Sequence, residues 1–353
     1  MKLFEPLALR SIHLRNRIAV SPMCQYSAED GTPTAWHLVH LGSRAVGGAG
    51  LVVAEATAVE ARGRISPGDT GLYDDRHVDG WAPVAQFIAE HGAVPAVQLA
   101  HAGRKASCAL PWCGGHPLSP DGGGWQPVVA PSALSFDEHS QVPHALTAGE
   151  IGDVVAAFRK AAERALAAGF QIVEIHAAHG YLLHEFLSPL SNHRTDDYGG
   201  SFDRRTHLLR QVVTAVRTVW PERLPLMVRI SATDWADGGW DIEQSIELAR
   251  RLKLLGVDLI DVSSGGLLPR VKIPVGPGFQ VPFAARIRRE AGIATGAVGV
   301  ITEARQAQAI VDGGDADVVL LAREMLRDPY WPLHAARTLG VEAAVPVQYR
   351  RAF

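Results

Sequence analysis

The feature that most constrains the fold of this chain is a regular alternation of short apolar runs with longer helical patterns. Eight runs rich in aliphatic and β-branched residues recur along the 353 residues, and helix-period stretches lie between them. Alternating strands and helices predict a parallel sheet covered by helices. Eight such units favour a closed (β/α)8 barrel over an open sheet. The predicted strands are 17–23, 51–59, 94–101, 170–179, 225–231, 259–266, 293–300 and 316–324.

The connections between these strands are also informative. Helices are predicted over 150–169, 243–256 and 303–313, each closed by glycine. No G-x-G-x-x-G motif follows the first strand, which argues against a dinucleotide-binding open sheet. Two connections, 104–147 and 182–201, are too long for turns, and such insertions are usually lids, binding loops or disordered tips. We therefore expect one barrel domain over 1–353, with an extended loop insertion after strand three and a capping loop after strand four.

Composition excludes several classes of protein. The formal net charge is -3, without a long block of one sign, so bulk charge indicates neither a nucleic-acid nor a membrane-surface partner. Three cysteines are too few for a disulfide framework and fit a reducing cytosol better. The N-terminus lacks a signal-peptide pattern, and no apolar run approaches the ~18–20 residues of a membrane span. We expect a soluble, cytoplasmic protein.

Polar or small residues lie at the C-terminal end of every predicted strand, where barrels of this kind collect their chemistry. One rim of such residues suits a large, flat, partly anionic ligand. Strands seven and eight of these barrels often bind phosphate through backbone N–H groups and a nearby helix N-terminus, and Arg323 would add a charged fork. In strand order the residues are Ser21–Tyr26, Glu55–Thr57, Gln98–His101, His176 with His179 and Tyr181, Arg229, Ser263–Gly266, Gly299, and Ala322 with Arg323.

The motif His176-Ala-Ala-His179-Gly-Tyr181 allows three interpretations. A metal site needs three or four ligands, and no thiolate or carboxylate cluster completes the set. A purely structural histidine pair stays open. The interpretation we favour is a pair of N–H donors that bind one ligand oxygen. Tyr181 is protonated at neutral pH and could deliver a proton in a dry site. Donors that polarise a carbonyl, with a neutral acid nearby, suit the addition of hydride and a proton across C=C–C=O.

Four longer stretches carry a resemblance to a known family. They are "SPMCQYS", "HAGRKAS", "IHAAHGYLLHEFLSPLSNHRTDDYGGSFDRR" and the closing "PVQYRRAF". Together they resemble the Old Yellow Enzyme-type flavin reductases, and most of all the thermophilic-like subgroup that includes xenobiotic reductase A. The resemblance covers essentially the whole chain. It implies an NADPH dehydrogenase that binds FMN without a covalent bond, takes electrons from NADPH or NADH, and reduces the C=C bond of α,β-unsaturated carbonyl or nitro compounds.

The resemblance also implies roles for individual residues. His176 and His179 would bind the substrate oxygen, Tyr181 would donate the proton, and Cys24 and Tyr26 would contact the substrate. Gln98 would face the flavin pyrimidine edge, and Arg229 would lie near N1 and C2=O, where its charge favours an anionic reduced flavin. The expected FMN contacts are Ser21, Pro22, Met23, Cys24, Ala56, Gln98, His176, Arg229, Gly299, Ala322 and Arg323. No metal is expected.

The C-terminal Arg351 corresponds to an arginine that reaches into the neighbouring subunit's site in this subgroup. The resemblance therefore implies a homodimer or homotetramer. Three departures from the family pattern are visible. Ala322 stands where glycine is usual before the phosphate-binding arginine, and Ala352 replaces a glycine beside Arg351. Arg204 and His207 replace the usual Asn and Arg, which should affect helix anchoring more than chemistry.

Two other classes remain as competitors. A metal-dependent barrel hydrolase would use the two histidines as ligands and would be colourless. A non-catalytic flavin binder would be yellow but would not turn over. The related dienoyl-CoA reductase type carries an iron–sulfur cluster, which three scattered cysteines cannot hold.

Overall fold

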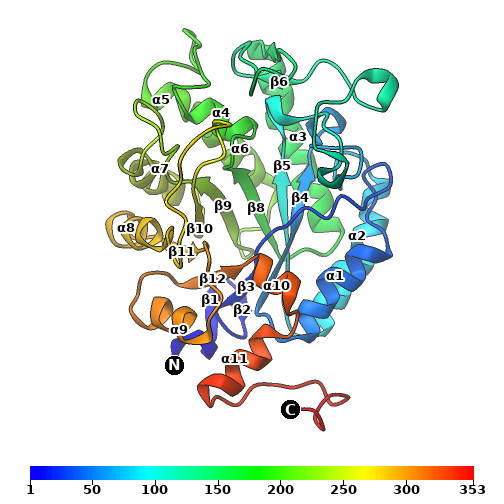
Figure 1. The fold of residues 1–353 in the computed structure, drawn as a ribbon, viewed down its shortest axis with the longest axis vertical. Helices are drawn as coiled ribbons and strands as arrows, with labels where there is room; N and C mark the ends of the chain where they lie inside the picture. Colours follow the sequence, from blue (N-terminus) through cyan, green and yellow to red (C-terminus); the bar gives the residue numbers. More distant parts are fainter.

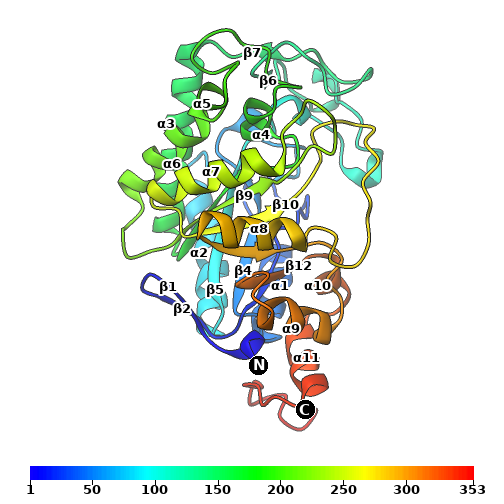
Figure 2. The same cartoon turned by 90° about the vertical axis from the view of Figure 1, so that its left-hand side faces the viewer.

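A computed structural model describes residues 1–353 and places eight parallel strands in one closed barrel. Helices surround the barrel (Figures 1 and 2). The predicted (β/α)8 architecture is confirmed, and every predicted strand is present in a shorter form. The barrel strands are β3 (Ile18–Val20), β4 (Leu51–Ala58), β5 (Val94–Ala100), β8 (Ile172–Ala177), β9 (Leu226–Ser231), β10 (Leu259–Ser263), β11 (Ala294–Ala297) and β12 (Val318–Leu321).

Several outer helices begin at residues that cap the first turn, and several end at glycine. Thr147 and Glu150 form a reciprocal capping box at the start of α3, and Gly292 ends α8 in the left-handed conformation with φ +63°. The eight longer helices are α1 (Ala35–Val46), α2 (Arg76–Glu90), α3 (Ala148–Ala167), α6 (His207–Val219), α7 (Ile242–Leu254), α8 (Val281–Ala291), α9 (Ala304–Asp312) and α11 (Trp331–Leu339). None of the helices combines the length and the apolar character needed to span a bilayer.

The barrel interior is layered because side chains of a strand alternate between its two faces. On β8, Ile172 belongs to the apolar cluster inside the barrel, whereas its neighbour Val173 packs in the larger cluster between strands and helices. With a period of two, Glu174 and then His176 follow Ile172 on the inner face. The interior therefore changes from apolar at one end to polar at the C-terminal ends of the strands.

A short hairpin, which the sequence patterns did not predict, covers the apolar end of the barrel. Strands β1 (Leu7–Leu9) and β2 (Ile12–Leu14) pair antiparallel. Leu9 and Leu14 join the cluster inside the barrel. The hairpin thus places apolar side chains at the N-terminal end of the barrel and leaves the other end for polar chemistry.

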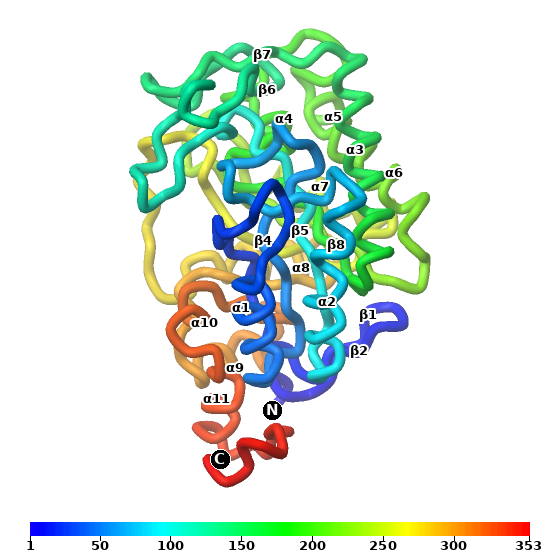
Figure 3. Tube along the Cα trace, turned by 90° about the vertical axis from the view of Figure 1, so that its right-hand side faces the viewer, coloured from blue at the N-terminus to red at the C-terminus, as the bar shows by residue number.

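The chain after β5 carries the long insertion, which includes the 3-10 helices η3 (Gly103–Lys105), η4 (Pro111–Cys113) and η5 (Pro120–Gly122) and the pair β6 (Val129–Ala130) and β7 (His144–Ala145). The segment around β6 and β7 lies at one end of the molecule, and the chain terminus after α11 lies at the other end (Figures 1, 2 and 3).

The predicted capping loop over 182–201 is partly helical. Its first residues form α4 (Leu182–Leu187), and all six side chains of α4 are buried. A helix buried on every side has no polar face, so its sequence lacks the periodicity that identifies surface helices. The short helices α5 (Phe202–Arg205) and α10 (Arg323–Arg327) were missed as well, because four or five residues are too few to show a helical period.

Candidate active site

Three aromatic side chains meet at the C-terminal end of β8. The ring of His176 lies 5.2 Å from that of His179 and 5.1 Å from that of Tyr181, edge to face in both cases. The turn that brings them together places His179 and Gly180 in the left-handed region, with φ +60° and +71°. A Cβ on Gly180 would lie 2.3 Å from the carbonyl oxygen of Gly266, so only glycine fits there.

The two histidines are neutral at pH 7. Burial lowers the pKa of both rings well below the usual value, and the nearby charge of Arg229 lowers it further. The backbone N–H of Ala178 donates to His176 Nδ1 over 3.3 Å. The proton of a neutral His176 ring must therefore sit on Nε2, which leaves Nε2–H as a donor.

The orientation of His179 depends on two serines. His179 Nε2 lies 2.7 Å from Ser263 Oγ, while the Ser264 hydroxyl donates to Gln280 Oε1 over 2.6 Å. Ser263 Oγ also lies 3.4 Å from that amide oxygen, so its closer partner is His179 Nε2. With the Ser263 hydroxyl donating to Nε2, a neutral His179 carries its proton on Nδ1 and is a second donor.

Tyr181 is held as a neutral phenol. Burial raises the pKa of its hydroxyl well above the ordinary value. The ammonium group of Lys105 lies 5.2 Å from the centre of the Tyr181 ring. Tyr26 lines the same pocket as Tyr181, and burial raises the pKa of the Tyr26 hydroxyl and of the Cys24 thiol. Both half-buried groups are therefore neutral at pH 7.

Gln98 and Arg229 lie on the strands that flank β8: Gln98 is paired with Glu174, two residues before His176, and Arg229 is paired with His176 itself. Gln98 on β5 and Arg229 on β9 are 2% and 5% exposed, and Arg229 donates to Ser21 Oγ over 3.0 Å. Ala56 is buried on β4, and Pro22, Met23 and Cys24 are half-buried in the segment after β3. The structure thus brings these residues to one end of the barrel, as the sequence predicted.

The ends of β11 and β12 form an anion cradle with unpaired donors. Gly299, Ala322 and Arg323 line one hollow of about 360 Å³. The backbone N–H groups of Gly299, Val300 and Ala322 have no acceptor within the chain, and the exposed Arg323 guanidinium has no acidic partner. Oriented N–H groups beside an arginine suit a phosphate.

The structure shows the surroundings of two of the departures from the family pattern. Ala322 has φ -102°, so no glycine is required there. His207 stacks on Tyr198 with ring centres 4.9 Å apart at the start of α6, and Arg204 lies 3.9 Å from Asp197. These contacts lie away from the histidine pair and anchor a helix start.

One predicted residue does not reach this end of the barrel. Arg351 is exposed in the tail after α11, which lies at the opposite end from the β6–β7 segment (Figure 1). Residues that the sequence patterns missed include Lys105, Arg104 and Phe136, which line one pocket of about 480 Å³ together with Tyr26 and Tyr181. Arg104 and Lys105 form the charged pair in "HAGRKAS", directly after the third strand. That position was the sequence signal that could have identified them.

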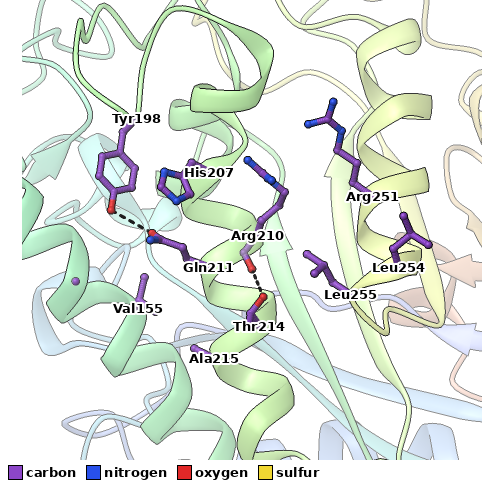
Figure 4. A pocket seen from close by; sticks show the side chains of 11 residues that line it. Val155, Tyr198, His207, Arg210, Gln211, Thr214, Ala215, Arg251, Leu254 and Leu255 are labelled. Atoms are coloured by element: carbon purple, nitrogen blue, oxygen red, sulfur yellow. Dashed lines mark hydrogen bonds between the residues drawn. The ribbon is translucent and has the colours of Figure 1, made fainter.

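A separate hollow of about 620 Å³ lies on the outside of the barrel between α3, α6 and α7 (Figure 4). Tyr198, Arg210, Arg251 and Leu254 are among its lining residues. It contains none of the predicted site residues. No group of three or more His, Cys, Asp or Glu side chains is arranged to hold a metal ion.

Known proteins are similar to this chain along nearly its whole length. Residues 2–342 match the model of the NADH:flavin oxidoreductase / NADH oxidase family. This chain belongs to that family. It is 50% identical over 351 residues to an NADPH dehydrogenase of Geobacillus sp. (strain WCH70), covering 99% of this chain and 98% of the relative. The NADPH dehydrogenase of Bacillus subtilis (strain 168) is 47% identical over 352 residues, with 99% and 98% covered.

Solved structures of this family, the Old Yellow Enzyme family, have the same fold. Morphinone reductase in complex with tetrahydroNAD superposes with a TM-score of 0.80 at 29% identity, covering 98% of this chain and 93% of that one. The Old Yellow Enzyme homologue of Zymomonas mobilis gives 0.78 at 27%, with 98% and 94% covered. The predictions of the family, of an FMN-dependent NAD(P)H oxidoreductase and of its two cofactors are confirmed at this level.

Proposed function

We propose that this protein is an ene-reductase that reduces the C=C bond of α,β-unsaturated carbonyl or nitro compounds. The observation that carries the proposal is the cluster of His176, His179 and Tyr181, in which the His176 ring centre lies about 5 Å from each of the other two, at the end of the barrel where Arg229 is paired with His176. This cluster offers two N–H donors and one neutral acid within reach of a single small ligand.

The residues present fit FMN. Unpaired N–H groups at Gly299, Val300 and Ala322, with Arg323, would hold the phosphate. Gln98 and Arg229 would bind the pyrimidine, and Arg229 would offset negative charge there. The remaining proposed contacts are Ser21, Pro22, Met23, Cys24, Ala56 and His176. Bound FMN supplies the chemistry of hydride transfer from NAD(P)H to the alkene.

The protein's own side chains would complete the reaction. Nε2–H of His176 and Nδ1–H of His179 would donate to the carbonyl or nitro oxygen and draw electron density away from the β-carbon. The Tyr181 hydroxyl would deliver a proton to the α-carbon, and solvent would later reprotonate it. Cys24 and Tyr26 would orient the substrate and help exclude water.

The subunit arrangement is part of the proposal. Arg351 is exposed, and the tail after α11 that carries it lies at the opposite end of the molecule from the β6–β7 segment (Figure 1). We propose a homodimer or homotetramer with Arg351 reaching the neighbouring substrate site. The single barrel domain over 1–353 and a cytoplasmic location stay predictions.

The test is an anaerobic absorbance titration with NADPH and then 2-cyclohexenone. We expect a flavin band that bleaches with NADPH and returns with the enone. Bleaching without reoxidation by the enone would contradict the substrate class but keep the flavin enzyme. A protein that cannot be loaded with FMN would contradict the proposal and return the metal-hydrolase interpretation.

A further inference from the structure

Two buried carboxyl groups lie beneath the proposed flavin site and take no part in the proposed reaction. Glu174 on β8 and Asp261 on β10 flank β9, the strand that carries Arg229, and both are fully buried. Glu174 Oε1 accepts a hydrogen bond of 2.7 Å from Gln98 Nε2. Asp261 Oδ2 lies 3.3 Å from Arg229 Nε. The pair therefore connects the two side chains proposed to bind the pyrimidine.

The remaining oxygen atoms of the pair require a proton. Glu174 Oε2 and Asp261 Oδ1 have no donor from any other group in the chain. The two carboxyl groups face Arg229 from the two strands that flank β9, and burial, together with the charge of Asp261, raises the pKa of Glu174. Two ionised carboxylates have no hydrogen to share, and one arginine can balance only one buried negative charge. One carboxyl must therefore be protonated, and a protonated Glu174 would be able to donate to Asp261.

We propose that Glu174 and Asp261 share a single proton and act as positioning residues for flavin reduction, orienting Arg229 and taking up one proton when the bound flavin is reduced. The inference rests on the proposed FMN site but not on the identity of the alkene. In this step a carboxylate oxygen takes a proton from solvent and forms an O–H bond, while the reductant supplies both electrons to the flavin.

The direction of the effect follows from charge. A flavin held by Gln98 and Arg229 would carry a negative charge after it takes up two electrons and one proton. That charge would raise the proton affinity of the nearby carboxyl pair. Burial and the neighbouring Asp261 raise the pKa of Glu174 to about 8. The other groups facing the pair are the guanidinium of Arg229, the amide of Gln98, which does not titrate, and His176, which is neutral because burial lowers its pKa.

The number of protons taken up on flavin reduction should depend on pH. Below about pH 8 the pair holds its proton in both oxidation states, so reduction takes up one proton per two electrons. Above that pH the oxidised protein has lost the shared proton and regains it on reduction, so uptake rises toward two. The bound flavin's midpoint potential should therefore fall more steeply with pH above about 8 than below it.

The experiment is a reductive titration of the FMN-loaded protein with dithionite between pH 6 and 10, followed through the flavin absorbance. Wild type should show the steeper slope at high pH. Glu174→Gln keeps a donor to Asp261 but cannot titrate, so its slope should stay at one proton per two electrons. Asp261→Asn removes the counter-charge of Arg229 and should raise the potential at every pH.

The matched control is Glu185→Gln. Glu185 is also fully buried and burial raises its pKa to about 8, but it contacts the backbone N–H of Arg104 and not Arg229. Its variant should keep the wild-type slope. The same slope in wild type and Glu174→Gln would overturn the proposal.

A second measurement needs only the wild-type protein. Its reduced-minus-oxidised infrared spectrum at pH 9 should gain a protonated-carboxyl C=O band that shifts in D₂O, and absence of that band would also overturn the proposal. Dithionite reduces the flavin directly, so this experiment does not depend on NADPH or on the alkene. A protein that shows the change of slope near pH 8 but does not reduce enones would contradict the proposed activity and leave this inference standing.

Discussion

The ammonium group of Lys105 donates a hydrogen bond of 2.9 Å to the backbone carbonyl of His179. The same group donates to Gly266 over 2.9 Å and lies 4.6 Å from the centre of the Phe136 ring. Lys105 therefore joins the loop after β8, the loop after β10 and the long insertion, directly beside Tyr181. A charge at this point holds the proposed acid in place.

Replacing Lys105 with methionine should slow alkene reduction on the order of 10²-fold, because small displacements of reacting groups cost that much. The reduction of bound flavin by NADPH should change far less. Stopped-flow measurement of the two half-reactions separates these effects. Lys253→Met is the control, since Lys253 also donates to a carbonyl, that of Gly292, but on the exposed side of α7. Equal losses in both half-reactions would contradict a role at Tyr181.

The Lys105 clamp should also depend on pH. Burial lowers the pKa of Lys105 to about 8, so the ammonium is present below this pH and is lost as pH rises through it. The wild-type rate of alkene reduction should fall above pH 8, whereas Lys105→Arg should keep its rate to higher pH because an arginine stays charged. Measuring the rate of alkene reduction against pH for both proteins tests this prediction. If both rates fall above pH 8 in the same way, a group other than Lys105 causes the decline.

Tyr181→Phe removes the proposed proton donor without removing the ring. Alkene reduction should drop on the order of 10²–10⁴-fold, the usual contribution of a general acid. Flavin reduction by NADPH should be unaffected, because no proton from Tyr181 is needed there. Tyr198→Phe, which removes a phenol that bonds Gln211 far from the site, should leave both steps unchanged. A variant that reduces enones at the wild-type rate would exclude Tyr181 as the acid.

Gly299→Ala should weaken FMN binding. Gly299 has φ +121°, and a Cβ there would lie 2.8 Å from Gln280 Nε2, so the cradle must shift. Strain of roughly 1–3 kcal/mol corresponds to about 5–150-fold in the FMN dissociation constant. Fluorescence titration of the apoprotein with FMN measures this dissociation constant. Gly276→Ala is the matched control, because a Cβ at Gly276 would meet nothing within 4 Å. Equal affinities of the two variants would place the phosphate elsewhere.

His184→Ala should destabilise the fold. His184 Nε2 lies 2.9 Å from Asp234 Oδ1 with both side chains fully buried, and His184 Nδ1 accepts the N–H of Gly180. Removing one partner of a buried pair costs about 3–5 kcal/mol. Glu163→Ala, which breaks an exposed pair with Arg159, should cost less than about 1 kcal/mol. Urea unfolding monitored by circular dichroism compares them, and a similar midpoint for both would show that the buried pair contributes little.

The parts of the fold that the sequence predicted are those with a repeating pattern. The apolar runs of β4, β5 and β8 predicted the barrel, and the residues after them predicted a candidate site at one end of it. Helix α4 and the β1–β2 hairpin were missed because they are short and lack a period. Lys105 was missed for another reason. Its partners His179 and Gly266 are distant in sequence, and backbone carbonyls leave no trace in a side-chain pattern.

The two-residue period of β8 limits how this site can change. Ile172, Glu174 and His176 share the inner face, so one inserted residue near the start of the strand would turn the residues after it outward. An apolar side chain would then replace the acid paired with Gln98, and the histidine would point at the helices. Substitutions can adjust this strand one position at a time, whereas changes in chain length are confined to the loops after β5 and β8. New substrate preferences in such a barrel should therefore arise through its loops.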